Sequence, residues 1–516
     1  MKPMLSMTLP AQSLALAKYP FALVGGASAT LAFAPFGWWP FMLVSMAIAL
    51  WLLPSSRPFL TGWSFGSGFF LAGISWVYSS MKVVDTPTPL AVAMTTLFCV
   101  AVGLLFGLQF KLHHWLFNRL KQVKEDSGQH MHFALFPVTW VLFEWLRSWL
   151  FTGLPWLYAG TAVTDTWIAG WLPLGGVFAT SALLAIAVAL AGWAWAGPSV
   201  LRSVFVALFA AGVLLGGLGL QQLTWVKAAD NPLAVVALQG NIDQRTKWNL
   251  ENILPTYELY RDFTLEHTDA DLILWPEAAI TTFTSQAIPF VDELNQIGQD
   301  SQTAILSGIL TDVRDEDGRF RVWNSVIGLG QAQGEFHKTR MVPFGEYVPL
   351  ESLIRGLIDF FNLPMSSISP GPSQQEAITW QHQGETLVVG TAICYEIAYP
   401  NLVRQRATDS QVLITVSNDS WFGGSIGPHQ HLQIARVRAI ANGRPVIRAT
   451  QDGMSAIVDH QGNVQALAEK FVQSAIRAEV YPTTGQTPYN RFGHSWLMLL
   501  GLLMLSYAWW RGRPTG

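Results

Sequence analysis

Charged residues are scarce in this sequence, and so is cysteine. Asp, Glu, Lys and Arg make up 13% of the 516 residues, whereas roughly a quarter is usual in globular proteins. Hydrophobic residues make up 51%, which excludes an ordinary soluble chain. The two cysteines, Cys99 and Cys394, do not make a disulfide framework.

Common nucleotide-binding patterns are absent as well, because the sequence has neither a Walker loop nor a Rossmann fingerprint, and it shows no tandem repeat. The charge that is present is unevenly distributed. Residues 227–487 hold 18 Lys and Arg against 29 Asp and Glu, a net charge of −11, while the rest of the chain carries +8. This contrast predicts two physical environments within one polypeptide.

Long apolar runs are abundant outside 227–487. A bilayer is crossed by about 17–25 mainly apolar residues, and we place eight such runs at about 16–34, 38–54, 60–80, 89–110, 132–151, 168–196, 199–219 and 493–510. The segment "APFGWWP", Ala34 to Pro40, interrupts the first two. We therefore expect a transmembrane domain of about seven helices at 1–226, a large domain outside the membrane at 227–487, and a C-terminal transmembrane helix with a cytoplasmic tail at 488–516.

The positions of Lys and Arg predict the orientation of these spans. With a cytoplasmic N-terminus, the short outside loops carry only Lys82 and Arg147. The inside segments carry ten basic residues: Lys2, Lys18, Arg57, Lys111, Arg119, Lys121, Lys124, Arg202, Arg511 and Arg513. This bias predicts a multi-pass membrane protein whose acidic 227–487 domain lies on the side away from the cytoplasm, which in a bacterium is the periplasm or the cell exterior.

Residues 227–487 alternate short β-branched apolar runs with helix-like segments, which is typical of an α/β domain. The run "LILWPE" ends in Glu277, and "TLVVGTAIC" ends in Cys394. Lys338 lies in "GEFHKTRMVPFGEYVP", which predicts an ordered loop after a short strand. Catalytic groups of α/β folds tend to lie at such strand ends. Each residue alone is weak evidence, because a lone Cys is more often a small buried hydrophobe.

In this order and setting, Glu277, Lys338 and Cys394 resemble the Glu–Lys–Cys triad of the nitrilase superfamily. The membrane-embedded half narrows the resemblance to the bacterial apolipoprotein N-acyltransferases. It extends over essentially the whole chain, through the motifs "FAPFGWWP", "EWLRSWLFTGLPW", "LQGNIDQRTKW", "LWPEAA", "HKTRMVPFGEYVP", "CYEIAYP", "NDSWFGGSIGPHQH" and "RPVIRATQDG". The resemblance implies a polytopic α-helical membrane domain of about eight spans and an α/β nitrilase-like α-β-β-α sandwich.

The same resemblance implies a reaction. The sn-1 acyl chain of a phospholipid, preferably phosphatidylethanolamine, passes through a thioester on Cys394 to the N-terminal amine of diacylglyceryl-cysteine in an apolipoprotein. Glu277 would be the general base, and Lys338 would supply positive charge to the thiolate and the oxyanion. Supporting or substrate-binding roles fall on Glu346, Tyr395, Glu396 and Trp248. We expect phospholipid, apolipoprotein and membrane lipids as partners, a monomer, and no metal, cofactor or nucleic acid.

Two other functions fit parts of the sequence. The chain could be a membrane-tethered nitrilase or amidase that hydrolyses a small amide, although one span would suffice as an anchor. It could also be a lipid-binding scaffold with an inactive outer domain, against which the intact triad argues.

Several residues keep alternative interpretations. His429 and His431 in "GPHQH" have no further ligands at zinc spacing, so we interpret them as structural, but spacing alone leaves a Cys–His dyad open. Glu144 and Arg147 form either a helical ion pair or a contact with a lipid headgroup. Trp248 either faces the substrate or packs at an interface.

Overall fold

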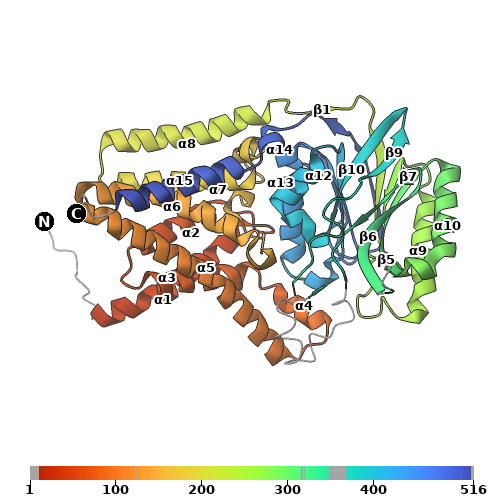
Figure 1. Ribbon diagram of the computed structural model, residues 1–516, viewed down its shortest axis with the longest axis horizontal. Helices are drawn as coiled ribbons and strands as arrows, with labels where there is room; N and C mark the ends of the chain where they lie inside the picture. Colours follow the sequence, from red (N-terminus) through yellow and green to blue (C-terminus); the bar gives the residue numbers. More distant parts are fainter. Residues whose placement is uncertain are drawn as a thin grey trace.

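A computed structural model of the protein describes residues 11–123, 125–314, 318, 320–343, 345–347 and 368–512. It places a bundle of helices at one end of the molecule and a layered α/β domain at the other (Figure 1). Three of the basic residues that predicted the orientation, Lys2, Lys124 and Arg513, lie outside the described residues.

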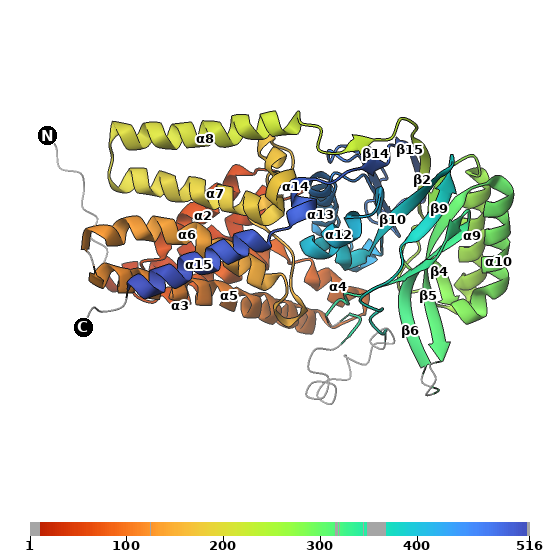
Figure 2. The same ribbon diagram turned by 45° about the horizontal axis from the view of Figure 1, so that its top comes forward.

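Apolar helices from both ends of the chain form the bundle (Figures 1 and 2). They are α1 (Ala11–Ala27), α2 (Pro40–Leu52), α3 (Pro58–Gly73), α4 (Val77–Val83), α5 (Thr88–Val123), α6 (Glu125–Arg147), α7 (Leu172–Ala196), α8 (Val200–Gln221) and α15 (Ser495–Arg511). Glycines let α3 approach its neighbours: a side chain at Gly62 or Gly66 would collide with α5, and one at Gly68 with the backbone of α1. Small residues permit such close packing of membrane helices.

Three described helical segments are long and apolar enough to cross a membrane, namely Thr88–Lys121, Trp167–Ala196 and Val200–Gln221. By contrast, α2 has 13 residues, α3 has 16 and α15 has 17, at or below the lower limit of about 17 residues for a span. A helix lies in each of the eight predicted segments. The apolar pattern therefore located the helices, while the crossing of a bilayer by all eight stays a prediction.

Two stacked sheets form the centre of the α/β domain (Figure 1). One has the strand order β14–β13–β12–β11–β10–β9–β7, and the other has the order β15–β2–β3–β5–β6–β8, with β4 beside β5. The first comprises β7 (Ala332–Gln333), β9 (Ile378–His382), β10 (Glu385–Ile393), β11 (Val412–Ser417), β12 (Val446–Thr450), β13 (Ala456–Val458) and β14 (Val464–Leu467). The second comprises β2 (Leu233–Gln239), β3 (Leu272–Leu274), β4 (Ile280–Phe283), β5 (Ala304–Arg314), β6 (Phe320–Gly330), β8 (Glu335–His337) and β15 (Ser474–Val480). A small separate sheet pairs β1 (Lys227–Ala228) with β16 (Thr483–Thr484).

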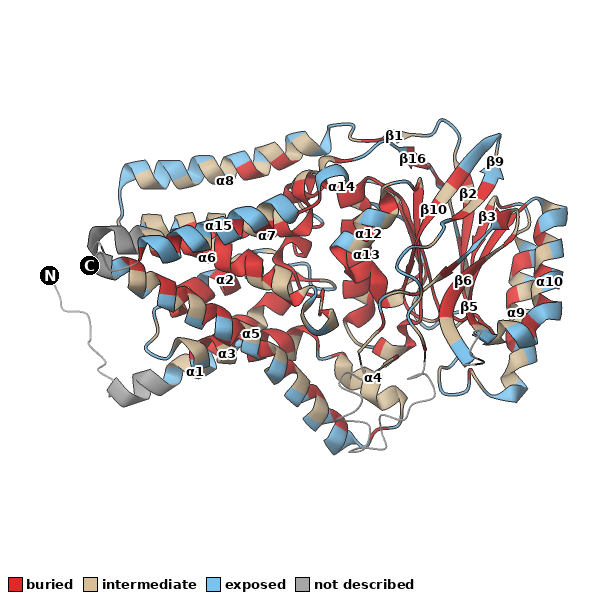
Figure 3. Ribbon diagram, in the orientation of Figure 1, coloured by how far each residue is buried: buried red, intermediate tan, exposed pale blue. Residues whose placement is uncertain are grey.

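Helices cover both outer faces of this pair of sheets. On the face away from the bundle lie α9 (Leu250–Glu266) and α10 (Thr284–Ser301), and between the sheets and the bundle lie α12 (Pro400–Ala407) and α13 (Gly427–Asn442) (Figure 1). The short α14 (Pro488–Phe492) leads back to α15. Strands β10, β11 and β12 are parallel, and every residue of β11 is buried, which explains its continuous apolar run. Figure 3 shows that the strands of the two sheets are largely buried. The arrangement is the α-β-β-α sandwich that the resemblance implied.

Buried side chains join the sandwich directly to the bundle. The Tyr395 ring stacks on Trp156, with centroids 6.1 Å apart and planes inclined by 12°, and the Tyr395 hydroxyl donates to the Gly153 carbonyl at 3.3 Å. The amide oxygen of Gln430 in α13 accepts hydrogen bonds from the indoles of Trp156 at 2.7 Å and Trp76 at 3.3 Å. The two parts are thus packed together and are not merely linked by the chain.

The two charged residues near the end of α6 do not pair with each other. Glu144 accepts hydrogen bonds from the Trp140 indole at 3.0 Å and the Ala159 N–H at 2.9 Å. The Arg147 guanidinium lies 5.1 Å from the centroid of the Tyr158 ring, a cation–π arrangement. The structure describes both residues and shows no ion pair between them, so the ion-pair interpretation is wrong.

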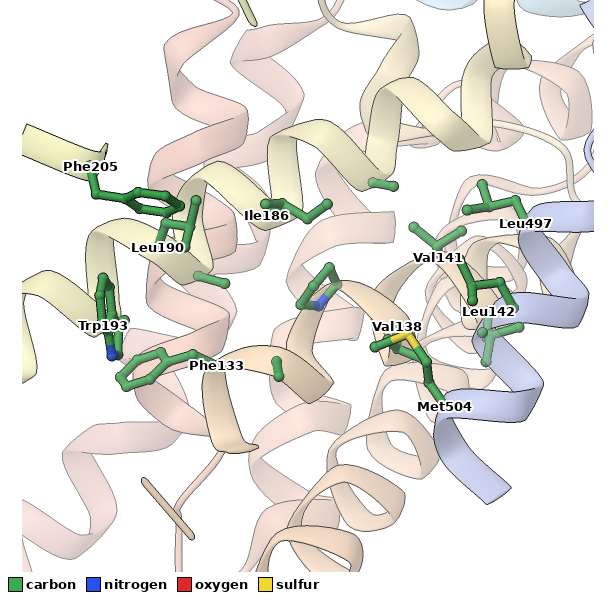
Figure 4. Close-up of a pocket in the computed structure, with 16 residues that line it drawn as sticks. Phe133, Val138, Val141, Leu142, Ile186, Leu190, Trp193, Phe205, Leu497 and Met504 are labelled. Carbon is green, nitrogen blue, oxygen red and sulfur yellow. The ribbon is translucent and has the colours of Figure 1, made fainter. Parts of the chain in front are cut away.

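A partly open apolar cavity of about 460 Å³ lies between helices of the bundle (Figure 4). Side chains of α6, α7 and α15 line it, with Phe205 of α8 at its edge. None of the residues that the sequence singled out for catalysis lines this cavity. The candidate active site therefore lies elsewhere, in the sandwich.

Candidate active site

Glu277, Lys338 and Cys394 each follow a strand, as their sequence patterns predicted. Glu277 lies between β3 and β4, Lys338 comes directly after β8, and Cys394 comes directly after β10. Strands β3 and β8 belong to one sheet and β10 to the other. The candidate site is therefore assembled from both sheets of the sandwich.

A buried network fixes Lys338 between two carboxylates. Its Nζ donates to Glu346 Oε1 at 2.6 Å and to Glu277 Oε1 at 3.4 Å. The side-chain amide of Asn324, in β6, donates to Glu277 Oε1 at 2.7 Å and to Glu346 Oε1 at 3.4 Å. All four residues are buried. Glu346, to which the resemblance gave a supporting role, thus contacts the lysine directly.

The charges of this network set the state of the lysine. Burial alone would lower the pKa of Lys338, but the Glu346 and Glu277 carboxylates raise that pKa above its ordinary value. Lys338 therefore stays protonated near neutral pH. Lys338 can therefore act as a fixed cation, and a different group must accept and donate protons.

Cys394 is a thiol at rest. Burial, reinforced by the negative charge of Glu277, raises the pKa of Cys394 to about 12, although Lys338 acts in the opposite direction. A thiolate is the reactive nucleophile, so the site needs a base that removes the thiol proton during the reaction. The carboxylate of Glu277 belongs to the same site and is a candidate for this base.

The backbone turns sharply at Cys394. Cys394 has a φ of 53°, which is uncommon for residues other than glycine, and it opens the 3₁₀ helix Cys394–Ala398. Ser417, at the end of the neighbouring parallel strand β11, places its hydroxyl 3.5 Å from Cys394 Sγ. The turn leaves Cys394 half-buried, while Tyr395 and Glu396 are buried. Part of Cys394 is therefore accessible at this turn.

Residues that the sequence did not single out hold Glu277. The Asn418 N–H donates to Glu277 Oε2 at 2.8 Å, and Lys247 Nζ donates to the Glu277 carbonyl at 3.2 Å. A side chain at Gly308, in β5, would collide with the Glu277 backbone. Asn418 and Lys247 lie within the quoted motifs "NDSWFGGSIGPHQH" and "LQGNIDQRTKW", but nothing local in those motifs shows which residue they contact.

Glu396 joins the loop after Lys338 to the turn after Cys394. Its carboxylate accepts hydrogen bonds from the Ile393 N–H at 3.0 Å and from the Thr339 N–H at 2.8 Å, and it forms an ion pair with Arg406 at 2.7 Å. Burial alone would raise the pKa of Glu396, but Arg406 and these donors lower it to about 2. Glu396 therefore supports the site without belonging to the Lys338 network.

We expect Glu396→Gln to destabilise the protein at pH 7, by about 3–5 kcal/mol, because Arg406 loses its buried partner. The folded-state pKa of Glu396 lies below its ordinary value, so its stabilising contribution is present above about pH 4.3 and is lost as the pH falls toward 2. The difference in thermal midpoint between wild type and variant should shrink from pH 7 to pH 3. An equal difference at both pH values would contradict this role.

The remaining candidates lie around the network. Trp248 packs in an apolar cluster with Leu310, Met341 and Ile368, and contact with a substrate stays a prediction. His431 places Nδ1 3.2 Å from Asp419 Oδ1 and Nε2 3.3 Å from the Cys394 carbonyl oxygen. Both ring nitrogens are thus engaged away from the thiol sulfur, in agreement with a structural role. Among the described residues, no group of three or more His, Cys, Asp or Glu side chains is arranged to hold a metal ion.

Comparison with known proteins matches both parts of the chain. Residues 25–190 match a family model described as Apolipoprotein N-acyltransferase N-terminal domain, and residues 233–489 match one described as Carbon-nitrogen hydrolase. A curated protein of Pseudomonas paraeruginosa named apolipoprotein N-acyltransferase is 38% identical over 496 residues, covering 94% of each chain. One of the same name from Vibrio vulnificus is 38% identical over 505 residues, covering 95% of this chain and 96% of its own. A solved structure, Saccharomyces cerevisiae Nit3 of the nitrilase superfamily, aligns with a TM-score of 0.37 and 18% identity, covering 50% of this chain and 93% of its own.

Proposed function

The chain belongs to the apolipoprotein N-acyltransferase family, and from this premise we propose that Cys394 carries an acyl chain between two lipid substrates. The donor is the sn-1 ester of a phosphatidylethanolamine-like phospholipid, and the acceptor is the N-terminal amine of diacylglyceryl-cysteine in an apolipoprotein. The observation that carries the proposal is the half-buried thiol on a sharp turn, within the electrostatic reach of Glu277 and Lys338.

In the first half of the reaction, Glu277 takes the thiol proton as Cys394 Sγ attacks the carbonyl carbon of the ester. The Lys338 ammonium and the Tyr395 backbone N–H stabilise the resulting oxyanion; a single donor of this kind contributes about 3–4 kcal/mol in a well-studied case. As the carbon–oxygen bond breaks, Glu277 returns the proton to the leaving oxygen. Lysophospholipid departs and a thioester remains.

In the second half, the free amine of the apolipoprotein attacks the thioester carbonyl. Glu277 takes a proton from the attacking nitrogen, the carbon–sulfur bond breaks, and the cysteine sulfur recovers the proton. The product carries a third acyl chain in an amide bond, and the enzyme returns to its starting state.

The junction between sandwich and bundle supports lipid substrates over a small soluble amide. Tyr395, next to the nucleophile, stacks on Trp156 of the bundle, so the thiol lies close to the helical part. A tethered amidase would need no such packing. We propose eight spans in the bacterial inner membrane, with parts at 1–226 and 488–516 flanking a periplasmic catalytic domain at 227–487, and a monomeric enzyme.

Isotope placement in the donor tests this function. Vesicles of phosphatidylethanolamine labelled in the sn-1 chain are incubated with the enzyme and a diacylglyceryl peptide, and the peptide is analysed by mass spectrometry. We expect one labelled acyl group on the N-terminal nitrogen, and no transfer of label placed in the sn-2 chain. Labelled free fatty acid with an unchanged peptide would instead support hydrolysis and contradict the proposal.

The proposed orientation predicts a labelling pattern for the two cysteines. A membrane-impermeant thiol reagent added to spheroplasts should label Cys394 and leave Cys99 unlabelled, because Cys99 is buried within α5. Acylation by phospholipid should protect Cys394, and the apolipoprotein acceptor should remove that protection. Labelling of Cys394 only after the membrane is breached would place the domain in the cytoplasm.

A further inference from the structure

Lys247 is a fully buried lysine that the proposed mechanism does not use. It lies on the loop between β2 and α9, directly before Trp248, and its relative exposure is 0%. Burial lowers the pKa of Lys247 to about 8, although the charges of Glu277 and Asp452 act in the opposite direction. Lysine is rarely buried so completely without a partner. Its position therefore calls for an explanation at the site.

The partner is the backbone of the proposed general base. Lys247 Nζ donates to the carbonyl oxygen of Glu277 at 3.2 Å. That carbonyl belongs to the peptide group between Glu277 and Ala278, and Ala278 has a φ of 47°. A non-glycine residue rarely adopts this conformation unless its surroundings enforce it. Lys247 is one of the groups that fix this peptide.

A second contact from the same loop reaches the carboxylate end of Glu277. The side-chain oxygen of Gln244 accepts a hydrogen bond from Asn418 Nδ2 at 2.5 Å, and the Asn418 N–H donates to Glu277 Oε2 at 2.8 Å. The loop thus supports Glu277 directly at its backbone and, through Asn418, at its carboxylate.

Resting on the function proposed above, we infer that Lys247 is a positioning residue that holds Glu277 in the geometry required to take the Cys394 proton. Proton transfer is sensitive to the placement of the base, because the donor and acceptor atoms must be within hydrogen-bond reach. Rotation of the peptide after Glu277 would move its side chain relative to the thiol. The loop that carries Trp248 therefore also orients the general base.

Lys247→Met tests this inference, because it keeps most of the side-chain length and removes the donor and the charge. The readout is the rate of thioester formation on Cys394 in a single turnover with phosphatidylethanolamine vesicles. We expect the maximal rate to fall roughly tenfold to a hundredfold, while the half-saturating phospholipid concentration changes less than about threefold. Lys470→Met is the matched control, because the charge of Asp452 also acts on Lys470 but Lys470 donates to the Gly423 carbonyl and not to Glu277. The Lys470→Met variant should form the thioester at the wild-type rate.

Two results with Lys247→Met would overturn the inference. The first is an unchanged rate of thioester formation. The second is a raised half-saturating phospholipid concentration with an unchanged maximal rate, which would mean that Lys247 supports substrate binding only. If Lys247→Met does not fold, Lys247→Gln replaces it as the test, because glutamine keeps an N–H donor but has a shorter reach. We expect Lys247→Gln to lower the maximal rate of thioester formation at least about fivefold. A wild-type rate in that variant would overturn the inference. Failure of the proposed function looks different, because the wild-type enzyme itself would then form no thioester.

Discussion

Cys394→Ser should abolish acyl transfer, lowering the rate of peptide N-acylation by at least about a thousandfold. Its surroundings raise the pKa of the Cys394 thiol to about 12, and a serine hydroxyl in the same place is a still weaker acid. A carboxylate such as Glu277 therefore has no means of generating enough alkoxide near neutral pH. The measurement is the rate at which the diacylglyceryl peptide gains an acyl chain in vesicles.

Cys99→Ser is the matched control for that substitution, because Cys99 lies in α5 of the bundle and far from the site in sequence. It should retain wild-type transfer. The Cys394 variant should have the same thermal midpoint as wild type, so that loss of activity is not loss of folding. More than a few per cent of wild-type activity in Cys394→Ser would contradict the assignment of the nucleophile.

Glu277→Gln should slow thioester formation by about a hundredfold to ten-thousandfold, the usual contribution of a general base. The amide keeps the shape of the side chain but cannot take the thiol proton. Lys338→Met should slow the same step, because the oxyanion loses its cation and the Glu277 and Glu346 carboxylates then face each other without the ammonium between them. Both rates are measured in single turnover without the acceptor peptide.

Glu335→Gln is a suitable control for these two variants, since Glu335 is an exposed residue of β8 whose carboxylate lies 3.5 Å from His337 Nε2, outside the network. It should form the thioester at the wild-type rate. A wild-type rate in Glu277→Gln would show that another group takes the proton, and His431 would be the first to test.

Two of the strand ends were predictable, because Glu277 and Cys394 each close an apolar run that is visible in the local sequence. Glu277 and Cys394 lie where "LILWPE" and "TLVVGTAIC" placed them, and Lys338 directly follows β8. What local sequence lacks is the partner across the sheets. Asn324 lies inside β6, and only the pairing of distant segments places its amide between Glu277 and Glu346. The local sequence around Lys247 also predicts the wrong environment, because a lysine in a polar loop is usually solvated, whereas Lys247 is fully buried.

The helical part shows a similar limit. Hydropathy located the apolar segments but not the exact ends of the helices: α2 ends at Leu52, shortly before Pro54, and has 13 residues. The spacing of Glu144 and Arg147 allowed a helical ion pair, yet Arg147 lies against the ring of Tyr158, which follows beyond the end of α6. Periodicity describes one helix at a time, whereas these contacts depend on how helices and loops pack.

The most direct test of the central claim is the mass of the enzyme after incubation with phosphatidylethanolamine vesicles that contain no acceptor. The account predicts a gain of one acyl chain on Cys394, which neutral hydroxylamine removes and which the diacylglyceryl peptide also removes as it becomes acylated. An unmodified enzyme that still acylates the peptide, or an adduct on another residue that resists hydroxylamine, would contradict a thioester on Cys394.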